Sequence, residues 1–247
     1  MCLSSYDLIM PVIMDLKGAV TTPSPAPSSP YASLRIAWAA FANADDMRSM
    51  TTSYGLLRSA CGLEDSCVKG REAFDIINEA TQASNAPERV KEQLVALSSM
   101  WHDREASRRD GGGTRVMISG AGPVGLRAAV ECALLGMEVR VVERQQSFVG
   151  AHLLQLWPQT LDDLLGLGAR VWLPRASLPS LPPVGGEAAM LHLTAREVQS
   201  LLLKDALILG VSFSCGAELV GLMAPRLESN SPSPSPSPSP SPSPWWA

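Results

Sequence analysis

The chain contains 247 residues, 46% of them hydrophobic, which is enough to build a buried core of ordinary size. Its formal net charge of −4 provides no broad positive field for a phosphate backbone, so no nucleic-acid partner is expected. Five cysteines without zinc-site spacing, and no apolar run near the roughly 20 residues that span a bilayer, predict a soluble cytoplasmic protein with neither a metal nor a membrane partner.

The first part of the chain predicts a leader followed by helices. Residues 1–32 end in the run TTPSPAPSSP, which favours neither a helix nor a buried face, so we interpret them as a disordered leader. Residues 33–109 are rich in helix formers, with apolar residues three and four apart, as at Leu34, Trp38 and Phe41. This region is predicted to form three or four amphipathic helices, a helical prelude to the rest of the chain.

A polar, glycine-rich link, RRDGGG, precedes the most informative part of the chain. An apolar strand is predicted directly after it, at Val116–Ile118. That strand leads into a GxGxxG loop at Gly120, Gly122 and Gly125. A strand followed by this loop and then by a helix is the fingerprint of a dinucleotide-binding βαβ unit.

Each glycine of the loop is expected to have its own role. Gly120 makes the tight turn from strand to helix, and Gly122 lets the backbone approach a pyrophosphate closely. Gly125 lets the helix pack against the strand. Pro123 suits the first helical turn, where its missing N–H is not needed. The free amides and the positive dipole end at this helix start predict an anion site.

The segments after the loop complete the predicted unit. A helix through Ala128 and Leu134 is apolar on most of its surface, as expected against a parallel sheet, and Gly136 ends it. A second strand at 138–142 leads to Glu143, whose carboxylate is expected to accept hydrogen bonds from a ribose hydroxyl. The same carboxylate disfavours a 2′-phosphate, so NADP is a poor fit at this position.

The remaining segments predict a return to the sheet. Thr194 and Glu197 form a capping box at the start of a leucine-rich helix, which Gly210 ends. Two short strands are expected after it, at 211–213 and 218–222.

The predicted fold class is therefore α/β. Residues 114–226 are expected to form the first half of a Rossmann-like FAD- or NAD(P)-binding domain. Residues 227–247, which contain a run of Ser-Pro repeats, are predicted to be a disordered tail. The alternative interpretation is a unit that has kept this fold and lost its ligand.

Three stretches of the chain are similar to a known family. They read GAGPVGLRAAVECALLGMEVRVVER from residue 120, LLQLWPQTLDDLLGLGA from residue 153, and LTAREVQSLLLKDALILGV from residue 193. These stretches resemble the FAD domain of the MICAL proteins, flavoprotein monooxygenases that oxidise methionines of actin with NADPH and oxygen. The resemblance implies FAD as cofactor, NADPH as co-substrate and actin as a partner.

The same resemblance implies which residues bind the cofactor. The pyrophosphate would be lined by Gly120, Ala121, Gly122, Pro123, Val124 and Gly125. Glu143 and Arg144 would hold the adenosine end of FAD. Arg196 and Gln199, on the later helix, would lie near the cofactor. No catalytic side chain is predicted, because the flavin itself carries the oxygen chemistry.

The chain departs from the family pattern in sequence and in length. Gly150 and His152 stand where the family has an Arg and an Asn, and the loss of a charged hydrogen bond costs about 1.5 to 3 kcal/mol. The family's monooxygenase domain is roughly twice as long, so we expect a truncated domain that lacks full catalysis. Trp157 is expected to be an ordinary core aromatic.

Two other functions remain open at this point. One is another FAD-dependent hydroxylase or oxidoreductase, because the βαβ unit is shared among such enzymes. The other is a non-catalytic interaction protein, in which the helices and the Ser-Pro tail bind a partner around a remnant nucleotide-binding fold.

Overall fold

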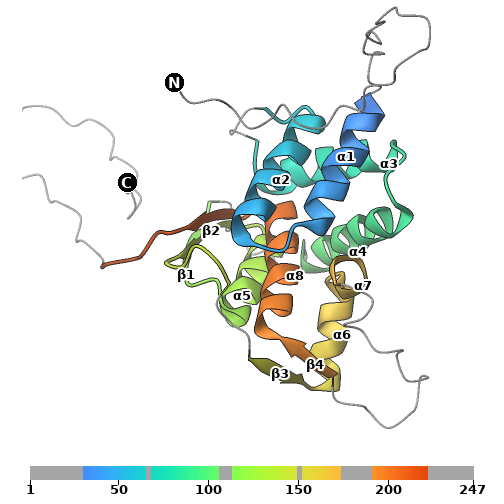
Figure 1. Cartoon of the computed structure of the whole chain (residues 1–247). Helices are drawn as coiled ribbons and strands as arrows, with labels where there is room; N and C mark the ends of the chain where they lie inside the picture. The colour runs from blue at the N-terminus through green and yellow to red at the C-terminus, as the bar shows by residue number, and fades with distance from the viewer. Residues whose placement is uncertain (1–29, 65–67, 106–112, 149–151, 174–190, 222–247) are drawn as a thin grey trace, which may run out of the picture.

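The computed structural model describes residues 30–64, 68–105, 113–148, 152–173 and 191–221 (Figure 1). Most of the predicted leader, the whole predicted tail, most of the RRDGGG link and Gly150 lie outside the described residues. Of the part described, no helix is long and apolar enough to cross a membrane.

The described part of the helical prelude contains four helices, within the three or four that the apolar periodicity predicted. They are α1 (Pro30–Asn43), α2 (Met47–Ala60), α3 (Gly70–Gln82) and α4 (Glu88–Glu105). The corner between α1 and α2 is fixed by a capping box, in which Asp46 accepts hydrogen bonds from the backbone amides of Arg48 and Ser49 at 2.9 and 3.0 Å. The Ser49 amide and hydroxyl also lower the pKa of the Asp46 carboxyl, because they hydrogen-bond to it.

The described residues that follow contain a three-stranded parallel sheet with helices packed on it, which confirms the predicted α/β class. The strands are β1 (Arg115–Ser119), β2 (Glu138–Glu143) and β5 (Ser212–Cys215), in the order β1-β2-β5. The connecting helices are α5 (Pro123–Leu134) and α8 (Ala195–Ile208), which pack against each other. This arrangement is an incomplete Rossmann-like fold, with β1 at one margin of the sheet (Figure 1).

The predicted boundaries of α8 are confirmed. Its first turn carries the capping box, because Thr194 Oγ1 accepts from the Glu197 amide at 3.2 Å and Glu197 Oε2 accepts from the Thr194 amide at 2.8 Å. The chain leaves the helix at Gly210, whose φ is +85°. A Cβ at Gly210 would lie 2.5 Å from the backbone nitrogen of Gly70, so the end of α8 abuts the start of α3.

The strand predicted at 218–222 is wrong for its described part. Residues 217–221 form no strand in the structure. After β5 the chain turns at Gly216, whose φ is +72°, and Val220 is 95% exposed. Alternating apolar residues suggested a strand, but a strand needs a neighbour for its backbone hydrogen bonds, and this segment leaves the sheet.

An excursion between β2 and α8 was not predicted from the sequence. It comprises β3 (Leu153–Leu156), α6 (Pro158–Gly166), α7 (Ala169–Trp172) and β4 (Leu191–Thr194), with β3 and β4 paired antiparallel at the base of the molecule in Figure 1. Trp157, which precedes α6, is 63% exposed. Its expected place in the core is therefore wrong: Leu156 of β3 and Leu193 of β4 join the core, but the Trp157 side chain, between β3 and α6, is left largely in solvent.

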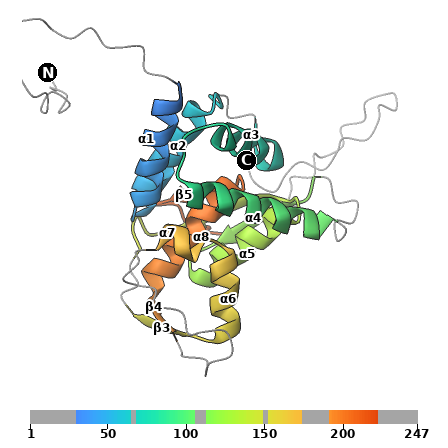
Figure 2. The same ribbon diagram turned by 90° about the vertical axis from the view of Figure 1, so that its right-hand side faces the viewer.

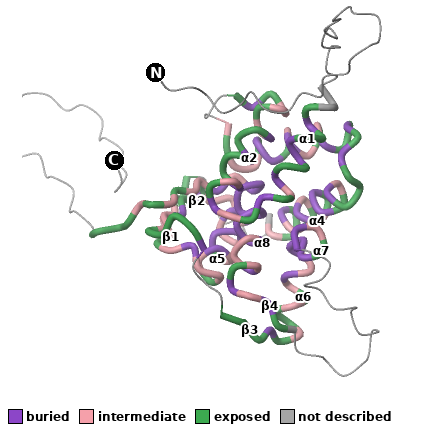
Figure 3. The backbone as a smooth tube through the Cα atoms, viewed as in Figure 1, coloured by how far each residue is buried: buried purple, intermediate pink, exposed green. Residues whose placement is uncertain are grey.

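A single hydrophobic core joins the prelude to the sheet. Trp38 of α1 stacks on Trp172 of α7 with ring centroids 6.5 Å apart, and Phe41 meets Trp172 edge-on at 5.9 Å. The centre of the core is α8, in which every residue from Leu201 to Ile208 is buried (Figure 3). The two parts therefore share one core.

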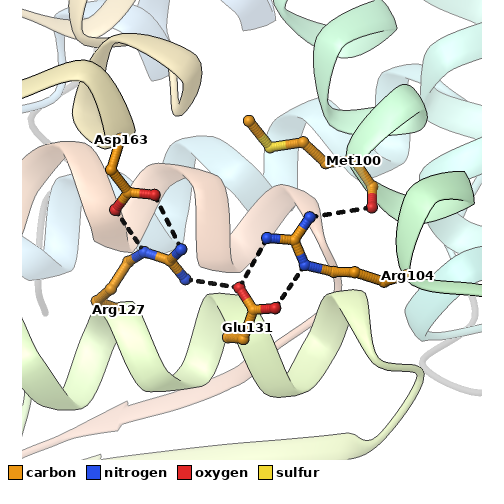
Figure 4. Close-up of polar contacts among 5 residues, drawn as sticks. All are labelled: Met100, Arg104, Arg127, Glu131 and Asp163. Atoms are coloured by element: carbon orange, nitrogen blue, oxygen red, sulfur yellow. Dashed lines mark hydrogen bonds and ion pairs between the residues drawn. The ribbon is translucent and has the colours of Figure 1, made fainter. Parts of the chain in front are cut away.

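An ion-pair network also links the prelude to the sheet. Arg127 of α5 makes two hydrogen bonds to Asp163 of α6, at 2.7 and 2.9 Å, and one to Glu131 at 3.0 Å (Figure 4). Glu131 also accepts from Arg104 of α4, whose guanidinium reaches the Met100 carbonyl at 3.2 Å. The network accounts for the position of α4 beside α5 (Figure 2).

Candidate dinucleotide site

A pocket of about 270 Å³ lies at the carboxyl ends of β1 and β2, beside the glycine loop. This is the edge of a parallel sheet at which ligands bind in α/β folds. Its lining residues are Met47, Gly122, Pro123, Glu143, Gln145, Ser147, Phe148, His152, Ala195 and Gln199.

Two glycines of the loop are required by the fold itself. Gly120 has a φ of +102°, a conformation that favours glycine, and its amide donates to the Val142 carbonyl at 2.8 Å. A Cβ at Gly125 would lie 2.5 Å from the Gly120 carbonyl oxygen and 3.3 Å from Ile118. The predicted roles, a tight turn and a close helix-to-strand approach, are what these positions show.

Gly122 is different, because the described structure gives no conformational or packing reason for a glycine there. Its φ is −68°, which any residue adopts, and a Cβ built on it would meet nothing within 4 Å. The space beside it belongs to the pocket. A glycine that neither the backbone conformation nor the packing requires is expected where a ligand must approach the backbone.

The start of α5 supplies the donors for an anion. Gly122 is the N-cap and Pro123 follows at the first helical position. No described side chain caps this end, and Gly122 and Pro123 line the pocket, so the positive end of the helix dipole borders it. Such an end attracts a phosphate group.

Glu143 closes the other side of the loop. Its Oε2 accepts from the Ala121 amide at 2.6 Å and its Oε1 accepts from the Gln145 amide at 2.7 Å. A carboxylate has about four acceptor positions, so two remain for the hydroxyl groups of a ribose. The carboxylate thus fixes the loop and still has room for a sugar.

Gln199 is the main contact between the loop and α8. Its side-chain amide donates to the Ala121 carbonyl at 2.8 Å, and it lines the pocket. The family pattern placed it near the cofactor together with Arg196. The structure separates the two side chains, because Arg196 turns toward the prelude, 3.4 Å from Asp45, and lines another pocket.

Five more of the predicted residues do not line the pocket: Gly120, Ala121, Val124, Gly125 and Arg144. Arg144 is exposed and forms an ion pair of 3.6 Å with Glu218. Val124 is 83% exposed on the outer side of α5.

Six residues of the pocket wall were not predicted as ligand contacts: Met47, Gln145, Ser147, Phe148, His152 and Ala195. His152 takes a position where the family pattern has an amide, so an imidazole replaces it in the wall. Phe148 is buried beside it. Met47 comes from α2, and no sequence signal links that helix to a loop more than 70 residues away. Only the packing of the prelude on α8 brings it there.

Metal ligands, reactive thiols and a second pocket are the other candidate sources of function in the part of the chain that the structure describes. There, no three His, Cys, Asp or Glu residues gather as metal ligands. Burial raises the pKa of the Cys61 thiol to about 11 and also raises that of Cys132, so both thiols stay protonated at neutral pH. A larger pocket of about 640 Å³ lies at the opposite end of the strands, around Gly136 and Gly210, away from the glycine loop.

Comparison of the sequence with known proteins finds similarity to one group of monooxygenases. No family model matches the chain. The [F-actin]-monooxygenase MICAL1 of Bos taurus is 43% identical over 113 residues, which are 46% of this chain and 10% of that protein. The Homo sapiens MICAL1 is 42% identical over 45% of this chain and 10% of its own length, and the Homo sapiens MICAL3 is 39% identical over 45% and 5%. The chain therefore matches a tenth or less of these relatives, and a little under half of it is similar to the MICAL F-actin monooxygenases.

Proposed function

We propose that this chain is the FAD-binding portion of a MICAL-like flavoprotein monooxygenase and that its glycine loop holds the ADP half of FAD. The observation that carries the proposal is Gly122, a glycine that faces open space in an ordinary backbone conformation. The sequence similarity to the F-actin monooxygenases supports the choice of a flavin over other dinucleotides.

The residues present fit a diphosphate and a ribose. The uncapped start of α5 would take the diphosphate, and Glu143 would accept from ribose hydroxyls. The pocket volume of about 270 Å³ suits this part of the cofactor but not the whole of FAD. We propose that Ala121 and Pro123 line the diphosphate, while Arg144 and Arg196 act from outside the pocket wall described above.

A bound flavin would supply the redox chemistry with NADPH and oxygen. The named relatives act on F-actin, and we extend NADPH, oxygen and actin to this chain only as proposals. The activity test is hydrogen peroxide formation after adding FAD and NADPH to the purified protein. Flavin binding without peroxide would limit the chain to a cofactor-binding role.

Binding itself is tested by a matched pair of glycine substitutions. Gly122→Val places a side chain in open space, so Tm should stay within about 2 °C of wild type while FAD and ADP affinity fall at least tenfold. Gly125→Val forces a side chain against the Gly120 carbonyl, so Tm itself should fall. Calorimetric titration and thermal unfolding measure both quantities.

Two results would contradict the proposal. A wild-type protein that shows no flavin absorbance and gains no stability on adding FAD or ADP would remove it. Unchanged affinity in Gly122→Val would move the ligand away from the glycine loop.

A further inference from the structure

The pocket beside the glycine loop is not closed by the sheet and its helices alone. Among the residues that the structure describes, nine of its lining residues belong to the sheet region and one, Met47, belongs to the prelude. Met47 is the first residue of α2 and is 1% exposed. It is therefore a fixed part of the wall rather than a mobile surface side chain.

The corner that carries Met47, residues 42–48, is held by three contacts. Lys204 of α8 donates to the Ala42 carbonyl in the last turn of α1 at 2.7 Å. Arg196 of α8 reaches the carbonyl of Asp45 at 3.2 Å. Arg48 donates to Gln146, in the segment after β2, at 2.8 Å.

These contacts connect the corner to the glycine loop through one helix. Gln199 of α8 holds the Ala121 carbonyl of the loop, between the positions of Arg196 and Lys204 on the same helix. The corner and the loop are thus fixed to a common rigid support. The distance between a ligand bound at the loop and the Met47 side chain would therefore be fixed by α8.

We infer that the 42–48 corner of the helical prelude is a wall of the nucleotide site, and that Met47 makes an apolar contact with the bound nucleotide. The inference rests on the proposed function. The flexible thioether chain fits such a role, because methionine adapts its shape to the surface that it meets. The prelude then acts on ligand affinity directly, and not only through stability.

A second methionine on the same helix provides the control. Met50 lies one turn later in α2 and is 0% exposed, yet it does not line the pocket. Met47→Ala and Met50→Ala remove the same atoms from the same core, so both should lower Tm. Only Met47→Ala should weaken FAD and ADP binding, by about three- to tenfold, whereas Met47→Leu should restore most of the affinity.

Calorimetric titration of each full-length variant at a temperature below both transitions decides the matter. Equal affinities for Met47→Ala and Met50→Ala, with the wild type binding normally, overturn this inference and leave the proposed function intact. No binding by the wild type overturns the proposed function itself. If Met47→Ala does not fold, Arg48→Ala replaces it, because Arg48 is exposed and its loss removes one of the three contacts that hold the corner. A two- to threefold weaker affinity then supports the inference, and an unchanged one overturns it.

Discussion

At the scale of single residues, one group that costs stability is a buried carboxyl outside the nucleotide pocket. Asp205 of α8 is 0% exposed and accepts from the Trp172 indole at 2.8 Å, but its Oδ2 has no hydrogen-bond partner in the described structure. Burial raises the pKa of this carboxyl well above its usual value of 3.8. The neighbouring Lys204 shows the matching effect, because burial lowers the pKa of its ammonium group to about 8.

Replacing this carboxyl should stabilise the protein at neutral pH. As pH rises above 3.8, the unfolded Asp205 loses its proton before the folded one does, so stability falls through this window. Asp205→Asn keeps the acceptor for Trp172 and removes this dependence. We expect the free energy of unfolding to rise by roughly 1 to 3 kcal/mol at pH 7 and the difference to shrink near pH 4. Urea denaturation at both pH values measures it, and a less stable variant at pH 7 would contradict the account.

At the scale of elements, the ion-pair network determines how α4, α5 and α6 meet. Hydrogen bonds from Arg104 lower the pKa of the Glu131 carboxyl below its usual 4.5. A lowered carboxyl pKa contributes stability that is present above pH 4.5 and lost as pH falls through the folded value. The contribution is moderate because Glu131 is about one-third exposed.

Glu131→Gln should therefore destabilise the protein by about 1 to 2 kcal/mol at pH 7, since charged hydrogen bonds to two guanidinium groups are lost. The loss should be smaller at pH 3 than at pH 7, because the charged hydrogen bonds of the wild type weaken as pH falls through the lowered pKa of this carboxyl. Asp75→Asn is the control, because Asp75 belongs to an exposed pair with Arg71 on one helix. Thermal unfolding at the two pH values compares them, and equal effects of both substitutions would argue against a special role for the network.

At the scale of the whole molecule, the shared core predicts one unfolding event. Leu57 of α2 and Leu203 of α8 are both 0% exposed and belong to the same core. Leu57→Ala and Leu203→Ala should each lower the free energy of unfolding by about 2 to 5 kcal/mol and shift a single transition. Circular dichroism and tryptophan fluorescence should then give coincident curves. Two transitions, each sensitive to one substitution, would instead favour the predicted division into 33–109 and 114–226.

The features that the sequence predicted correctly are those that depend on residues close together in the chain. The loop glycines, the capping box of α8 and its end at Gly210 depend on backbone conformation within a few positions, so short patterns reveal them. The antiparallel pairing of β3 with β4 depends on contacts across some 40 residues, and it was missed. Met47 in the pocket and the hydrogen bond from Arg196 to the Asp45 carbonyl, 151 residues apart in sequence, follow only from tertiary packing.

The contact between Gly210 and Gly70 limits which residues can stand where the end of α8 meets the start of α3. Two main chains touch there, with an added carbon at Gly210 only 2.5 Å from the Gly70 nitrogen. A clash with a side chain can be relieved by rotation of that side chain, but a clash with backbone atoms cannot. A methyl group at Gly210 would therefore have to displace α8 relative to α3. Gly210 therefore has no conservative replacement, whereas a Cβ at Gly70 would meet nothing within 4 Å and only its φ of +57° favours glycine there, so the close approach constrains the end of α8 more than the start of α3.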